Sequence, residues 1–188
     1  MQKHITAADT TTIRVVLITL DNHLAGAVEA AQDAIRHEAP NVEVKFHVAA
    51  QWSASPEALA RCKADIKTAD IIIVTMLFLE EHIRAILPDL EARQPHCDAI
   101  AGLMSAGEIM RLTRLGKFSM AAKDSGITAL LKRLRGAGRS SSGASSGAKQ
   151  MQMLKRLPRL LRFIPGAAQD VRAYFILMQY WLAGSNFY

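Results

Sequence analysis

Two acidic side chains stand beside a histidine at Glu80-Glu81-His82, after a strongly apolar stretch of the chain. A carboxylate pair near an imidazole can transfer protons or bind a metal ion. Carboxylates are also expected in the first turn of any helix, because the amide dipoles there favour negative charge. His82 has no second histidine four residues away. The sequence therefore favours a helix start over a catalytic or metal site.

A second polar group, Asp21-Asn22-His23, follows an apolar run and opens a predicted helix. Amides at a helix N-terminus can hold an anion, and His23 could add a donor. A simpler interpretation is that Asp21 or Asn22 caps the helix, and cap frequencies favour it. The sequence contains neither GxGxxG nor GxxxxGK[S/T], so it gives no basis for dinucleotide or P-loop nucleotide binding.

The two cysteines, Cys62 and Cys97, are too few for a disulfide scaffold. Cys97 stands between His96 and Asp98, but no second cluster at ligand spacing accompanies them, so it is interpreted as a core residue. The first twelve residues are polar, which argues against a secretion signal. We expect a cytoplasmic location, with peripheral association at a membrane as an addition.

The charge of the chain is unevenly distributed, although its net value is +6. Residues 111–172 hold 14 Lys and Arg and two acidic residues, whereas the rest of the chain holds 9 Lys and Arg and 15 acidic residues. A solvated helix face is the first interpretation of this basic segment, and docking to a partner or an anionic membrane the second. Few aromatic residues interrupt it, which makes nucleic acid an unlikely partner. The docking candidates are Arg133, Arg135, Lys155, Arg156, Arg159 and Arg162.

Four segments have the composition of strands that could position the polar groups. Three are apolar and β-branched or small, and are predicted to be buried. Val42–Val48 alternates, which predicts a half-buried strand near an edge. The run around Ile71 is the most apolar and is predicted to lie at the sheet centre. The segments are Ile13–Leu20, Val42–Val48, Asp70–Val74 and Asp98–Met104.

Helical periodicity separates these strands and continues after them. Ser55 and Pro56 form a helix start, because serine caps and proline fits the first helical position. The predicted helices are Leu24–His37, Pro56–Thr68, Leu79–Leu90, Glu108–Leu115, Ile127–Arg135, Met151–Ile164 and Ala167–Leu182.

Alternation of strand and helix predicts an α/β fold, a Rossmann-like or flavodoxin-like open parallel sheet of about four strands with flanking helices. Polar or small residues follow each strand, where open sheets bind ligands. We expect this domain over residues 1–115. A basic helical extension is expected over 116–188, with a flexible Gly/Ser loop at 136–147.

An ordered set of segments resembles the N-terminal region of the large, porphyrin-binding H subunit of magnesium chelatase, which is related to the large subunit of cobaltochelatase. No single motif is chemically diagnostic, but the set covers nearly the whole chain in order. Its Ser-rich loop and basic residues are similar to the bacteriochlorophyll branch. The carrying segments are VVLITLDNHLAG at 15–26, LFLEEHIRAILPDL at 77–90, Cys97-Asp98, MRLTRLG at 110–116, ALLKRLRG at 129–136, LKRLPRLLRFIPGAAQD at 154–170 and QYWLAGS at 179–185.

The resemblance implies a part of an enzyme that inserts Mg²⁺ into protoporphyrin IX in bacteriochlorophyll biosynthesis. It implies two ATP-hydrolysing AAA+ subunits and the remaining domains of the H subunit as partners. No cofactor is expected within this segment; protoporphyrin IX, Mg²⁺ and ATP belong to the full complex. Family members are much longer, so the chain is expected to be an N-terminal fragment that is not catalytic alone. No catalytic residue is carried over.

Two other functions stay open on the residues alone. One is a free-standing α/β binding module that uses Asp21-Asn22-His23 and Ser105-Ala106-Gly107 at the carboxyl edge of the sheet. The other is a membrane-surface or nucleic-acid binder that uses the basic residues between 132 and 162.

Overall fold

The computed structural model describes residues 11–20, 22–121 and 167–183. The chain divides into two compact units, Met1–Arg114 and Leu115–Tyr188. Strand and helix alternate through the first unit, as the sequence predicts. Its elements are β1 (Ile13–Thr19), α1 (Ala25–Glu38), β2 (Val42–Val48), η1 (Ala49–Gln51), α2 (Pro56–Thr68), β3 (Ile71–Thr75), α3 (Glu80–Arg93), β4 (Ala99–Leu103) and α4 (Gly107–Arg111).

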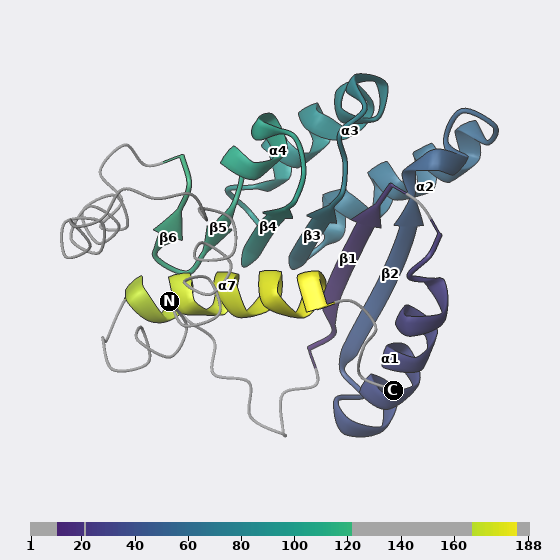
Figure 1. Cartoon of the computed structure of the whole chain (residues 1–188). Helices are drawn as coiled ribbons and strands as arrows, with labels where there is room; N and C mark the ends of the chain where they lie inside the picture. The colour runs from purple at the N-terminus through teal and green to yellow at the C-terminus, as the bar shows by residue number, and fades with distance from the viewer. Residues whose placement is uncertain (1–10, 21, 122–166, 184–188) are drawn as a thin grey trace, which may run out of the picture. The chain divides into compact units, whose positions relative to one another are not determined.

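Four parallel strands form the sheet of this unit, in the order β2-β1-β3-β4 (Figure 1). The predictions that β2 lies at an edge and β3 inside the sheet are confirmed. Two short strands that the sequence did not predict, β5 (Arg114–Leu115) and β6 (Phe118–Ser119), follow in the strand order, so the sheet has six strands. The predicted helix over Glu108–Leu115 is wrong at its end, because α4 stops at Arg111.

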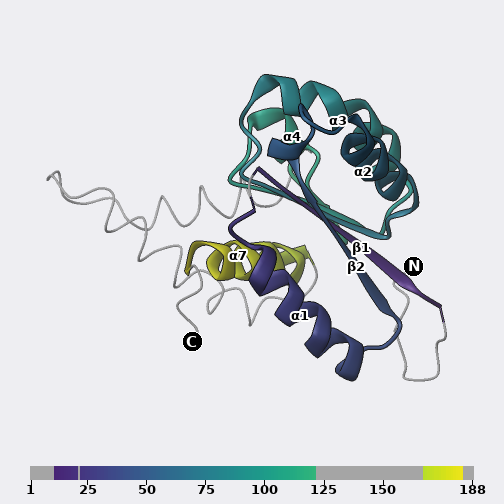
Figure 2. The ribbon, with the colours of Figure 1, turned by 90° about the vertical axis from the view of Figure 1, so that its right-hand side faces the viewer.

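The two faces of this sheet are covered by different helices. The chain leaves β1 in one direction to reach β2 and returns past β1 to reach β3. Right-handed crossovers in opposite directions place α1 and α2 on opposite faces, and Figure 2 shows α1 across the sheet from α2 and α3. Val16, Ile18, Ile72 and Val74 belong to the buried core on the α2 and α3 face. The residues that alternate with these four along β1 and β3 therefore point to the opposite face, which α1 covers.

Local chemistry explains where the helices begin and end. The Ser55 hydroxyl accepts a hydrogen bond from the Ala58 N–H at 3.2 Å, and Pro56 is the first residue of α2, so this predicted start is confirmed. Helix α3 continues to Arg93, three residues beyond the predicted end, with Pro88 inside it. Helix α4 approaches β4 closely at Gly102, where a side chain would meet the Ile109 carbonyl oxygen at 2.7 Å.

The described part of the second unit joins the β5–β6 turn to α7 (Ala167–Ala183), a helix predicted from Ala167. Gly116 has a φ of +55°, and the next N–H, of Lys117, donates to the Asp170 carboxylate at 2.8 Å. The Phe118 and Tyr174 rings pack edge to face, 5.7 Å apart. Among the described residues, no helix is long and apolar enough to cross a membrane. The predicted helices over 127–135 and 151–164 and the loop at 136–147 lie outside the described residues.

Candidate functional site

The loops after β3 and β4 are joined into one structure at the carboxyl edge of the sheet. The Ser105 hydroxyl is buried, accepts from the Leu77 N–H at 3.1 Å and donates to the Leu103 carbonyl at 3.0 Å. The Met76 N–H donates to the same Leu103 carbonyl, and the Ala106 N–H donates to that of Leu77. Ser105 therefore positions both loops and is not available as a nucleophile.

Both of these loops begin with a non-glycine residue of positive φ. Met76, directly after β3, has a φ of 56°, and Met104, directly after β4, has a φ of 43°. Side chains rarely adopt this conformation, because the Cβ then approaches the backbone. The hydrogen bonds between the two loops hold the backbone in this conformation. The side chains of Phe78 and Leu79, which follow, are exposed by 56% and 48%.

The polar group after β1 does not cap α1 through a described side chain. Residue Leu24 occupies the N-cap position, and no side-chain hydrogen bond is made there. Asn22 contributes only its backbone carbonyl, which accepts from the Ala25 N–H at 3.0 Å. The prediction of a side-chain cap is therefore wrong for Asn22, and Asp21 lies outside the described residues. Asn22 and His23 are exposed.

The three residues Glu80, Glu81 and His82 lie in the first turn of α3 but point into different surroundings. Both carboxylates are exposed, and Glu80 pairs with Arg84 one turn later. His82 is 6% exposed and packs edge-on against Trp52, with ring centroids 5.7 Å apart. Its Nε2 is 3.6 Å from the Glu81 carboxylate, and its Nδ1 has no partner among the described residues. The two carboxylates thus lie in solvent and the imidazole in the core. This arrangement is typical of acids in the first turn of a helix beside a buried histidine, and not of an acid–base pair.

No group of three or more His, Cys, Asp or Glu side chains within the described ranges could hold a metal ion. Both cysteines are buried and free. Burial raises the pKa of the Cys62 thiol to about 12. Burial also raises the pKa of the Cys97 thiol, although the nearby Arg114 guanidinium opposes the shift. Neither thiol is a ready nucleophile or metal ligand at neutral pH. Both cysteines are core residues, as the sequence suggested for Cys97.

Two polar contacts within the first unit were not anticipated from the sequence. The His47 Nε2 of β2 lies 2.9 Å from an Asp65 carboxylate oxygen of α2. Burial lowers the pKa of His47, and Asp65 opposes this shift. The Arg114 guanidinium donates to the carbonyl oxygens of Gln94, at 2.8 Å, and Cys97. The signal for His47 was its place among the polar positions of an alternating strand, but nothing local in the sequence specified Asp65.

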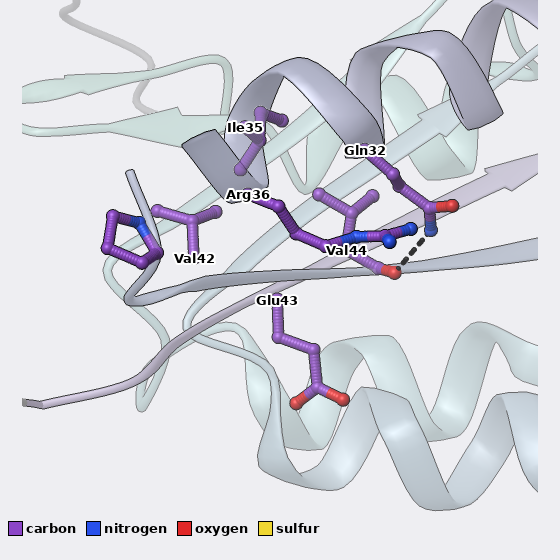
Figure 3. Close-up of a pocket in the computed structure, with 7 residues that line it drawn as sticks. Gln32, Ile35, Arg36, Val42, Glu43 and Val44 are labelled. Carbon is purple, nitrogen blue, oxygen red and sulfur yellow. Dashed lines mark hydrogen bonds between the residues drawn. The ribbon is translucent and has the colours of Figure 1, made fainter. Parts of the chain in front are cut away.

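A pocket of about 310 Å³ lies between α1 and the edge strand β2. In the wall of this pocket, the Gln32 side-chain amide donates a hydrogen bond to the Val44 carbonyl at 2.8 Å. Figure 3 shows that the Glu43 side chain points to the opposite side of β2. Ile35, Arg36 and other residues of α1 and β2 complete the lining. None of the residues predicted as site candidates lines this pocket. The basic docking candidates Arg133, Arg135, Lys155, Arg156, Arg159 and Arg162 lie outside the described residues.

Comparison with known proteins identifies relatives over nearly the whole chain. Residues 14–175 match the model of a family described as a domain of unknown function, DUF3479. The chain is 47% identical to the magnesium-chelatase H subunit of Rhodobacter capsulatus and 44% identical to that of Cereibacter sphaeroides. In each case 172 residues align, which is 92% of this chain and 14% of the relative.

A plant relative shows the same pattern at greater distance. The chloroplastic ChlH protein of the magnesium chelatase of Oryza sativa is 28% identical over 180 residues, 92% of this chain and 12% of the relative. The chain thus spans about one seventh of the length of the bacterial relatives. The match extends across both units and confirms the resemblance seen in the sequence. The chain belongs to the DUF3479 family, the family of the N-terminal region of the magnesium-chelatase H subunit.

Proposed function

We propose that the chain is the N-terminal domain of the porphyrin-binding subunit of a magnesium chelatase of bacteriochlorophyll biosynthesis. The observation that carries this proposal is 47% identity to a bacterial H subunit over 92% of the chain. In the full complex, Mg²⁺ enters protoporphyrin IX while two AAA+ partner subunits hydrolyse ATP. The complex acts in the cytoplasm, with peripheral contact at the membrane. The domain itself needs no cofactor.

Within that complex we assign the domain to docking or gating rather than to metal insertion. Its described carboxylates do not converge: Glu80 and Glu81 face solvent, whereas His82 is buried beside Trp52. Metal insertion needs groups that accept the pyrrole protons and ligands that deliver Mg²⁺. The arrangement at the start of α3 supports neither task. The remaining domains of the H subunit would supply these groups.

The test compares the full-length H subunit with a version that lacks this domain. Mg²⁺ insertion is measured with both AAA+ subunits and ATP, and porphyrin binding is measured separately by quenching of protein fluorescence. We expect deletion to slow insertion at least tenfold and to leave porphyrin affinity within threefold. An unchanged insertion rate would refute the docking or gating role.

The isolated chain provides the second arm. Protoporphyrin IX is titrated while the fluorescence of Trp52 and Trp181 is recorded, with free tryptophan as the control for inner-filter quenching. We expect no saturable quenching. Saturable quenching of the wild-type chain would instead assign the domain a direct part in porphyrin capture.

A further inference from the structure

The strand order reverses between β1 and β3, at the carboxyl edge of the sheet. From β1 the chain moves outward through α1 to β2, and β3 then pairs with the other side of β1. The two connections therefore leave in opposite directions. Open α/β sheets place ligands outside the strand ends at such a reversal.

The last residues of these two strands are threonines that lie side by side. Thr19 of β1 is the register partner of Thr75 of β3, and both side chains are fully buried. Their neighbours in the same row, Val48 and Leu103, are apolar and buried. Each threonine directly follows a residue of the α2 and α3 core, so both hydroxyls point to the face of α1.

Neither hydroxyl has a hydrogen-bond partner among the described residues. An unpaired hydroxyl in an apolar row destabilises a fold, because it loses its hydrogen bonds to water on burial. Nearly all buried polar groups in native proteins have a hydrogen-bond partner, so two unpaired hydroxyls side by side indicate a missing partner. A threonine hydroxyl carries one proton, so each of the two can donate a hydrogen bond to such a partner.

The first turn of α1 lies on the same face and begins six residues after Thr19. It has no side-chain cap and no acidic residue. Gly26 and Ala27 are exposed, and their N–H groups donate to no other described residue. No heavy atom lies within 4 Å of the Cβ position at Gly26, so the space beside it is open. Unpaired amides of this kind bind anions.

We propose that the hydroxyls of Thr19 and Thr75 and the first-turn amides of α1 bind the oxyanion group of a small ligand, a phosphate or a carboxylate. All four groups are donors, the helix dipole adds positive potential, and no acid in that turn repels the ligand. This site goes beyond the proposed function, which does not require a small ligand at this edge. It therefore stands or falls independently of the chelatase assay.

The proposal is tested on the chain of 188 residues with inorganic phosphate and, in a second arm, acetate, at constant ionic strength with chloride as the balancing anion. The backbone amide signals of Gly26 and Ala27 are followed by NMR. We expect saturable shifts at both amides. The anion that binds more tightly identifies the source of the oxyanion group as phosphate or carboxylate.

The variants Thr19→Val and Thr75→Val keep the shape of the side chain and remove the hydroxyl. Each is expected to weaken binding about tenfold, because a hydrogen bond to a charged group is lost. Without anion, each should melt at the same temperature as wild type or higher, because an unpaired buried hydroxyl is removed.

The matched control is Thr113→Val, since Thr113 is equally buried but its hydroxyl oxygen accepts from the Gly102 N–H at 3.0 Å. We expect this variant to melt lower and to bind the anion as wild type does. Three results each overturn the proposal: absence of saturable shifts at Gly26 and Ala27, shifts that both valine variants leave unchanged, or a lower melting temperature for both valine variants in the absence of anion.

Discussion

Replacing Gly102 with alanine tests the close approach of α4 to β4. The added Cβ would lie 2.7 Å from the Ile109 carbonyl oxygen, 2.9 Å from its carbon and 3.0 Å from the Met110 Cα. All three atoms belong to the backbone, so no side-chain rotation relieves the contact. The first turn of α4 must move away by about 0.7 Å to restore ordinary van der Waals separation.

The expected cost follows from two opposing effects. Overpacking of a rigid interior site costs roughly 1–3 kcal/mol, and the movement also strains the hydrogen bond from the Gly102 N–H to Thr113. Alanine restricts the unfolded chain more than glycine does, which returns about 0.4–1 kcal/mol. We expect Gly102→Ala to lower the free energy of unfolding by about 1–2 kcal/mol.

The assay is urea unfolding followed by Trp52 fluorescence in a Trp181→Phe background, so that the signal reports the first unit alone. Gly26→Ala is the matched control, because Gly26 lies in helix α1 and its added methyl group would meet no atom within 4 Å. It should raise stability by about 0.5 kcal/mol. If Gly102→Ala were as stable as the wild-type chain while Gly26→Ala behaved as expected, the close approach would not exist in solution.

Three further changes have expected outcomes. Gly116→Ala should speed hydrogen exchange at the Lys117 amide, because its φ of +55° disfavours alanine and the new methyl would lie 2.8 Å from the Asp170 carboxylate; an unchanged exchange rate would contradict this contact. Burial lowers the pKa of His47 below its ordinary 6.5, so its contribution to stability is fully present above about pH 6.5 and is lost as pH falls through the folded-state pKa. Urea midpoints of His47→Gln should therefore fall less than those of wild type between about pH 7 and pH 5, and parallel pH profiles would refute this linkage. Ser55→Ala should lower the free energy of unfolding by about 1 kcal/mol, because the Ala58 N–H loses its cap; an unchanged urea midpoint would show that the cap is dispensable.

The regular part of the fold was predictable because its signals are local. Alternation in Val42–Val48 gave the edge strand and its bounds, and Ser55-Pro56 gave the start of α2. Strands β5 and β6 were missed because two residues are too few to show a period. Helix α4 is shorter than predicted because Arg114 and Leu115, at the end of the predicted helix, form β5 instead.

The candidate site was less predictable, since its determinants are contacts. The sequence places Glu80, Glu81 and His82 together, but helical geometry sends the histidine into the core and the acids into solvent. The pairing of Thr19 with Thr75 needs the strand register, which no short motif reveals. Polar residues at the carboxyl edge could be located by pattern, whereas their hydrogen-bond partners could not.

The hydrogen bond from Gln32 to Val44 has a consequence for the behaviour of the protein in concentrated solution. The Ile13 N–H donates to the Asn41 carbonyl, so alternation directs the Val44 carbonyl toward the open side of β2. An open strand edge recruits other chains by backbone pairing. Gln32 occupies the acceptor in the middle of that edge, and the exposed Lys45–Glu43 ion pair adds charge beside it. This glutamine thereby occupies one backbone acceptor that a second chain would need in order to pair with β2.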